Sequence, residues 1–146
     1  MERLSALMLR RGMSRGILVL DENIYDLEPW LQNHNFRVKR VTPGTPDSKI
    51  SQDLSFRIFF TKNPRDFVLS AWEFEFGLIG VTDAAMADPA KVAKKISDAY
   101  ARYKLRTTIP FRLTISPTTT SIRYLTEENV AKENPIEFED LPPKPR

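Results

Sequence analysis

Residues 57–68, RIFFTKNPRDFV, decide the fold class of this chain. A short apolar run in this stretch is followed at once by the polar residues Asn63 and Asp66, which is the pattern of a buried strand that leads into a helix. Residues 16–23, GILVLDEN, repeat the pattern, with Asp21 directly after the apolar run. A chain built from such strand–helix units is expected to form a parallel sheet with helices packed against it.

Strand and helix patterns alternate through the first hundred residues. The predicted strands cover residues 16–21, 36–41, 58–60 and 77–81, and the predicted helices cover residues 24–33, a short segment that starts at Pro46 and is capped by Thr45, residues 63–74 and residues 88–103. Residues 111–126 alternate apolar and polar side chains, which predicts two more strands around a turn at 116–119. The predicted fold is a three-layer α/β/α fold with a mainly parallel central sheet and a C-terminal β-hairpin.

The chain divides into three segments by composition. Residues 1–15 are predicted to be an N-terminal extension and residues 16–125 to be one domain. Residues 126–146 are acidic and rich in proline, with few apolar side chains, so we expect a flexible tail that is extended or disordered.

Composition excludes several classes of function. The chain has 146 residues, of which 41% are hydrophobic and 28% charged, as in a globular domain. It has no cysteine, which excludes disulfides and thiolate metal sites, and the single histidine, His34, argues against a histidine-based zinc site or a Ser-His-Asp triad. No apolar stretch is long enough to span a bilayer, and the N-terminal residues lack the arrangement of a signal peptide, so we expect a cytoplasmic protein.

Charge is distributed unevenly along the chain. Residues 1–125 carry 19 Lys and Arg against 13 Asp and Glu, whereas residues 126–146 carry 3 against 6. The predicted domain is therefore moderately basic, which suits a polyanionic partner such as a nucleic acid. An ordinary solvated surface with a small excess of positive charge explains the same numbers.

Three separate segments bring acidic side chains to one edge of the predicted sheet. In an open parallel sheet, functional groups lie beyond the carboxyl ends of the strands. Asp21 follows the first strand, Asn63 and Asp66 follow the third, and Asp47 begins the helix after the second. Because neighbouring carboxylates repel one another, a divalent cation such as Mg²⁺ or Mn²⁺ would stabilise them.

Helix capping explains the same residues without a metal. Asn63 and Asp66 occupy the cap and the third position of a helix start, where an acid interacts favourably with the helix dipole. Asp47 lies in the first turn of its own helix, and Asp21 or Asn23 could cap the helix at 24–33. Spacing alone therefore leaves both interpretations open.

The order and spacing of the motifs resemble those of the PIN-like nuclease superfamily. The motifs are ILVLDENI (17–24), NFRVKRV (35–41), DSKI (47–50), IFFTKNPRDF (58–67), LIGV (78–81) and FRLTI with SIRYL (111–125). The resemblance covers residues 16–125 and is nearest to a short branch whose chains open with Leu-Asp-Glu-Asn, to which bacterial VapC-type toxins are related. It implies a parallel sheet flanked by helices, and cleavage of RNA with Mg²⁺ or Mn²⁺ held by acids.

Matching motifs assign roles to individual residues. The resemblance implies that Asp21, Asp47 and Asp66 are the metal ligands, with Asp21 central. Asn63 stands where that branch usually has Asp, so this candidate catalytic residue would bring an oxygen atom without a charge, and the attraction for a divalent ion would be weaker. Glu22 could compensate for the missing charge.

Basic residues near the predicted site suggest an RNA-binding surface. The candidates are Lys62 and Arg65 beside the acids, and Arg37, Lys39 and Arg40 on the second strand. The resemblance further implies a toxin of a toxin–antitoxin pair, with an antitoxin protein as partner, and a homodimer. The alternative is a non-catalytic PIN-like module that binds nucleic acid or a protein, and Asn63 favours this alternative.

A receiver domain of a response regulator is a third possibility that the sequence argues against. Such a domain needs an aspartate at the end of its third strand and a lysine at the end of a later one. Here Thr61 stands directly after the third predicted strand, and the fourth ends at Val81.

Overall fold

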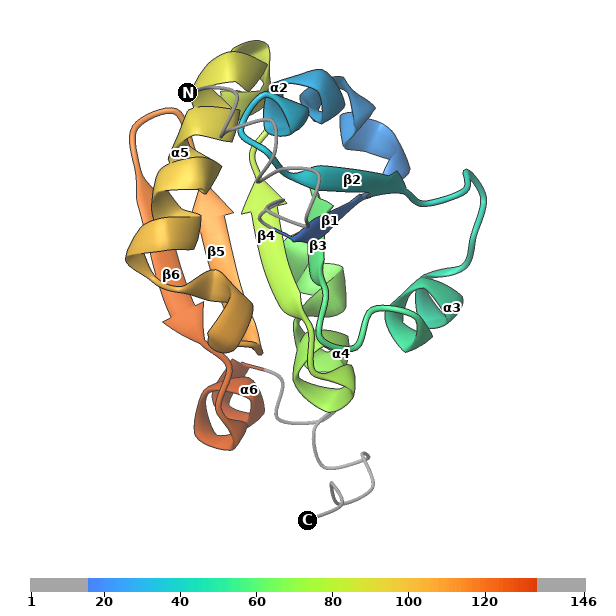
Figure 1. The fold of residues 1–146 in the computed structure, drawn as a ribbon. Helices are drawn as coiled ribbons and strands as arrows, with labels where there is room; N and C mark the ends of the chain where they lie inside the picture. The colour runs from blue at the N-terminus through green and yellow to red at the C-terminus, as the bar shows by residue number, and fades with distance from the viewer. Residues whose placement is uncertain (1–15, 134–146) are drawn as a thin grey trace.

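A six-stranded sheet forms the centre of the molecule (Figure 1). The computed structural model describes residues 16–133, so the predicted N-terminal extension and the end of the predicted tail lie outside the described residues. The strands are β1 (Ile17–Leu20), β2 (Arg37–Arg40), β3 (Ile58–Thr61), β4 (Gly77–Val81), β5 (Phe111–Ile115) and β6 (Thr120–Tyr124), in the order β2-β1-β3-β4-β5-β6. The first five strands are parallel to their neighbours and β6 is antiparallel to β5, which confirms the predicted α/β class with a mainly parallel sheet.

Helices pack against both faces of this sheet (Figure 1). The 3-10 helices are η1 (Glu22–Leu27), η2 (Pro64–Phe67), η3 (Ala85–Ala87) and η4 (Leu105–Thr107), and the α-helices are α2 (Glu28–Gln32), α3 (Asp47–Gln52), α4 (Val68–Phe74), α5 (Pro89–Arg102) and α6 (Glu127–Glu133). The sheet residues Leu18, Leu20 and Phe60 belong to a core cluster with η1, α2 and α5, whereas Val19 and Phe59 belong to a second cluster with α3, α4 and α6. The alternation follows from the pleat, which turns successive side chains to opposite faces.

Two predicted helices begin as 3-10 helix rather than as one continuous α-helix. The segment predicted as helix 24–33 is η1 followed by α2, and Pro29 lies in the first turn of α2, where its missing N–H interrupts no helical hydrogen bond. The segment predicted as helix 63–74 is η2 followed by α4. In both segments the 3-10 helix lies between a strand and the N-terminus of an α-helix, where short 3-10 turns are frequent.

The start of α3 differs from the prediction by one residue. Pro46 is the N-cap and Asp47 the first helical residue, and no side chain caps this end. The hydroxyl of Thr45 instead donates to the carbonyl oxygen of Thr42 over 2.6 Å. Thr45 therefore closes the preceding turn, in which its backbone N–H also donates to the carbonyl oxygen of Thr42 over 3.2 Å.

The predicted flexible tail is wrong for its first part, because Glu127–Glu133 form α6. Thr126 caps this helix by accepting from the backbone N–H of Asn129 over 3.1 Å. Val130 is fully buried and packs with Leu125 in the second core cluster. One apolar residue in a polar segment is enough here, since the cap and the acids of the first turn also favour a helix.

The strand order places a crevice beside β1. From β1 the chain continues to β2 on one side, whereas β3 pairs with β1 on the other. At such a reversal, the connections that leave the carboxyl ends of the two neighbouring strands diverge, and ligands of open α/β sheets bind in the space between them. None of the helices within residues 16–133 is long and apolar enough to cross a membrane.

Candidate functional site

A polar cavity of about 160 Å³ opens at this crevice. All four candidate catalytic residues, Asp21, Asp47, Asn63 and Asp66, line it together with Glu22. They come from the segments that follow β1, β2 and β3. The structure therefore brings together the side chains that the sequence predicted at this edge of the sheet.

Asp21 is the most firmly held residue of the group. Its backbone N–H donates to the carbonyl oxygen of Phe60 over 3.0 Å, which extends the pairing of β1 with β3 by one residue. Its Oδ1 accepts from the backbone N–H of Glu22 over 2.8 Å and caps η1, while its Oδ2 accepts from the hydroxyl of Thr61 over 2.8 Å. Asp21 therefore both caps η1 and belongs to the candidate site, and both of its carboxylate oxygens are fixed in direction.

Thr61 is a site residue that the sequence analysis missed. Its side chain is completely buried, donates to Asp21 and accepts from the backbone N–H of Asn63 over 3.0 Å. The signal was present, because a hydroxyl residue ends an otherwise apolar strand beside the strand of Asp21. A threonine in a strand is common, however, and only the pairing of β1 with β3 reveals its partner.

The position of η2 brings Asn63 and Asp66 to the cavity. Gly80 in β4 leaves room for the ring of Pro64, since a Cβ atom at residue 80 would lie 2.5 Å from Cγ of that ring. Asn63 makes no side-chain cap of η2, contrary to the predicted helix start. Both polar side chains, Asn63 and Asp66, are exposed to solvent at the cavity.

Asp47 interacts electrostatically with the other two acids. Partial desolvation at the cavity raises the pKa of this largely exposed carboxyl above its ordinary value of 3.8, and the negative charges of Asp21 and Asp66 raise it further. The effect shows that three carboxylates from separate segments share one electrostatic environment.

Glu22 fixes the loop that leads to Asp47. Its Oε2 accepts from the backbone N–H of Gly44 over 3.3 Å, at a residue whose φ of 84° suits glycine. The side chain thus braces the loop between β2 and α3.

The donor set suits a hard cation, but the side chains do not converge on one point. Carboxylate, amide and hydroxyl oxygens are the ligands that Mg²⁺ and Mn²⁺ prefer. Within residues 16–133, however, no three His, Cys, Asp or Glu side chains lie closely enough together to hold a metal ion as they stand. An ion here would have to draw the exposed side chains of Asp47 and Asp66 toward Asp21, which is already fixed.

The five predicted RNA-binding residues do not form one surface. Lys62 pairs with Asp83 over 3.1 Å, and Arg65 is exposed beside the cavity. Arg40 is bonded to Glu28 and lies 4.6 Å from the ring centre of Tyr25, so its charge is engaged on the other face of β2.

Arg37 and Lys39 alternate with Arg40 along the edge strand β2. Both are exposed, and neither forms an ion pair with any residue in the described part of the chain. Arg37 pairs in register with Ile17, at the opposite end of β1 from Asp21. Of the strand residues, Lys39 is therefore the free cation nearer to the acids.

Comparisons of this chain with protein-family models, curated proteins and solved structures found no match.

Proposed function

We propose that this protein is a metal-dependent ribonuclease of the PIN-like type, which uses Mg²⁺ or Mn²⁺. The observation that carries the proposal is that Asp21, Asp47, Asp66 and Asn63 line one cavity at the carboxyl ends of β1 and β3. The effect of Asp21 and Asp66 on the pKa of Asp47 supports it, because such mutual repulsion is what a bound cation relieves. The resemblance of the motifs to PIN-like nucleases supports the choice of reaction.

Each residue has a distinct part in the proposed site. Asp21, fixed through Thr61 and η1, supplies the carboxylate around which the others assemble. Asp47 and Asp66 supply charge from exposed positions, and Asn63 supplies an amide oxygen. A bound Mg²⁺ or Mn²⁺ supplies Lewis acidity, which lowers the pKa of water and neutralises charge on a phosphodiester.

Basic side chains near the acids would hold the RNA backbone. Arg65 and Lys39 have no ion-pair partner among residues 16–133, so their charges are available to phosphates. A toxin role with an antitoxin partner, and a homodimer, belong to the same proposal through the resemblance alone, and the cytoplasmic location expected from the sequence belongs to it as well.

A second candidate function is a non-catalytic PIN-like module that binds nucleic acid or a protein. One observation favours it, namely that no three acidic side chains in the described chain converge closely enough for a metal ion. The amide of Asn63 also favours this function, because it carries no charge where the PIN-like branch usually has an aspartate.

Cleavage of single-stranded RNA with Mn²⁺, with and without EDTA, tests the first proposal. Wild-type protein is compared with Asp21→Asn and with Asp98→Asn, a matched loss of one exposed carboxylate on α5 that is not at the cavity. The nuclease proposal expects metal-dependent cleavage by wild type and Asp98→Asn, and none by Asp21→Asn. Cleavage that persists in Asp21→Asn would refute it, and absence of cleavage by all three folded proteins would leave the non-catalytic module.

A further inference from the structure

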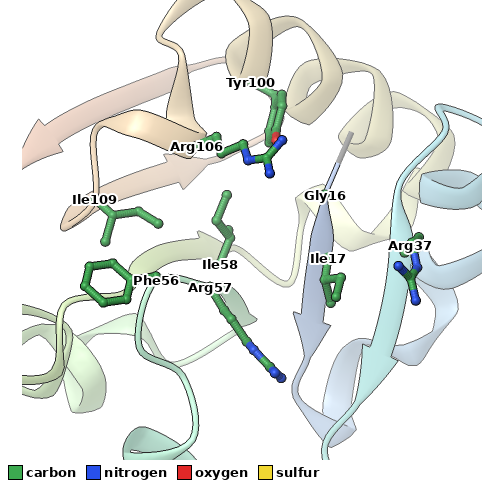
Figure 2. A pocket seen from close by; sticks show the side chains of 9 residues that line it. All are labelled: Gly16, Ile17, Arg37, Phe56, Arg57, Ile58, Tyr100, Arg106 and Ile109. Atoms are coloured by element: carbon green, nitrogen blue, oxygen red, sulfur yellow. The ribbon is translucent and has the colours of Figure 1, made fainter. Parts of the chain in front are cut away.

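A second cavity, of about 350 Å³, lies at the other end of the strands from the acidic cavity (Figure 2). It opens at the amino ends of β1 and β3, where Ile17 and Ile58 are lining residues. Since β1 has four residues, this cavity is separated from Asp21 by about 13 Å of strand, at about 3.3 Å per residue. It is therefore a separate place from the acidic cavity, and its volume falls within the range of small-molecule sites.

Arginine side chains dominate the charge of this cavity. Arg37, Arg57 and Arg106 line it, and no Asp or Glu does. None of the three guanidinium groups forms an ion pair within residues 16–133. Three cations with no counter-ion in the described chain create a positive potential that attracts an anion.

The arginines lie on both sides of the sheet edge. Figure 2 shows Arg106 reaching toward Tyr100 of α5 on one side, and Ile17 between Arg37 and Arg57 on the other. The planar guanidinium fork matches the geometry of a phosphate and can donate two hydrogen bonds to it. The separation of the three arginines suits a ligand with more than one polar group, or a polymer chain that runs across the ends of the strands.

Phe56 gives the cavity an aromatic end. Its side chain is 72% exposed, and Figure 2 shows its ring beside Ile109, away from Arg37 and Arg106. Its backbone has a φ of 62°, which is unfavourable for a bulky residue, and is held there by a hydrogen bond of 2.7 Å from its N–H to the carbonyl oxygen of Glu75. Such strain is kept where the surrounding structure imposes it, and it often marks a functional position.

We propose that this cavity binds a nucleotide, with a base stacked on Phe56 and phosphate groups bound by Arg37, Arg57 and Arg106. An exposed aromatic ring in the same cavity as guanidinium groups without an ion-pair partner in residues 16–133 is a combination that binds bases and phosphates together. A free mononucleotide and one unit of a single strand share this chemistry. The proposal does not depend on the acidic cavity or on RNA cleavage.

Calorimetric titration with 5′-AMP and with a 5′-phosphorylated single-stranded RNA tests the proposal. EDTA is present throughout, so that metal-dependent binding at the acidic cavity is suppressed. The variants are Arg57→Gln, Arg106→Gln and Phe56→Ala, all at exposed or half-buried positions where the fold is expected to survive. Arg102→Gln, an exposed arginine of α5 outside the cavity, is the matched loss of charge.

The proposal expects both AMP and the RNA to bind. Each arginine substitution in the cavity should weaken binding of the RNA about tenfold, as for the loss of a hydrogen bond to a charged group, and at least one of them should weaken binding of AMP, which has a single phosphate. Phe56→Ala should weaken it as well, whereas Arg102→Gln and Asp21→Asn should not. Tighter binding of RNA than of AMP, with a steeper salt dependence, identifies a strand as the ligand, and equal binding identifies the mononucleotide.

Two results would overturn the proposal. One is failure of the folded wild-type protein to bind either probe. The other is binding that ignores Phe56 and that polyglutamate displaces as readily as AMP does, since that would reveal general affinity for polyanions. If the wild-type protein binds AMP but does not cleave RNA, only the proposed nuclease function is refuted, and the nucleotide site stands.

Discussion

The hydroxyl of Thr61 donates to Oδ2 of Asp21 over 2.8 Å, and Oγ1 of Thr61 itself accepts from the backbone N–H of Asn63 over 3.0 Å. These two hydrogen bonds tie the end of β1 to the end of β3 and to the start of η2. One buried side chain thus sets the position of two candidate catalytic residues, although it lies behind the cavity and does not line it.

Replacing Thr61 with valine should lower both stability and metal affinity. Valine preserves the shape but leaves the Asn63 N–H without its acceptor, so the free energy of unfolding should fall by about 1–2 kcal/mol. The affinity for Mn²⁺ should fall about tenfold, as when a residue that orients a metal ligand is lost. Thr61→Ser, which keeps the hydroxyl, should restore the affinity in the same calorimetric titration, and equal affinities of the valine and serine variants would show that Thr61 has no positioning role.

Replacing Gly80 with alanine should displace η2. The new Cβ atom would lie 2.5 Å from Cγ of Pro64, so the ring and the following Asp66 must move, at about 1–3 kcal/mol of stability. Gly77→Ala is the matched control, because its Cβ atom would meet the ring of Phe111 at 2.4 Å, at the other end of β4. Chemical denaturation should show both variants destabilised, but only Gly80→Ala should bind Mn²⁺ more weakly; unchanged affinity in Gly80→Ala would contradict the placement of Asp66.

Neutralising Asp47 should stabilise the metal-free protein at neutral pH. Partial desolvation, and then the charges of Asp21 and Asp66, raise the pKa of Asp47 in the folded state, so its ionised form is less favourable there than in the unfolded chain. This destabilisation is fully present above the raised pKa and disappears as the pH falls to 3.8 and below. In EDTA at pH 7, Asp47→Asn should therefore unfold at a higher urea concentration than wild type, with a difference that shrinks as the pH is lowered; a less stable variant at pH 7 would contradict the electrostatic coupling of the three acids.

Shortening Val130 to alanine tests whether α6 belongs to the domain. The side chain of Val130 is completely buried, so losing its two methyl groups should lower the free energy of unfolding by about 2 kcal/mol. Lys132→Ala, at an exposed position of the same helix, should change it by less than about 0.5 kcal/mol. If urea denaturation gave the two variants the same stability, α6 would not be part of the cooperative unit.

The order of strands and helices was predictable because each strand is a short apolar run that ends at polar residues. Apolar residues alternate with basic ones in residues 36–41, a pattern that indicates a strand near the edge of a sheet, and β2 is indeed an edge strand. The 3-10 starts at Glu22 and Pro64 were not, because the spacing of apolar residues does not distinguish a 3-10 turn from the first turn of an α-helix. Helix α6 was missed because a single apolar residue, Val130, anchors it, and only the assembled core shows what that residue contacts.

The sequence predicted which acids form the candidate site, but it did not predict which residues hold those acids in place. Asp21, Asp47 and Asp66 follow strands whose carboxyl ends meet, and that rule needs no side-chain detail. Thr61 acts through a hydrogen bond between two strands 40 residues apart, which depends on their register. No sequence motif indicates the second cavity, because Phe56 and Arg106 come to line it only through the tertiary fold.

Titration of Mn²⁺ into wild-type protein, Asp21→Asn and Asp98→Asn by calorimetry tests the central claim most directly, with circular dichroism to establish that each is folded. The account predicts that wild type and Asp98→Asn bind Mn²⁺ with the same affinity and that Asp21→Asn binds at least about tenfold more weakly. Failure of folded wild-type protein to bind Mn²⁺, or equal binding by Asp21→Asn, would contradict a metal site at the carboxyl ends of β1 and β3.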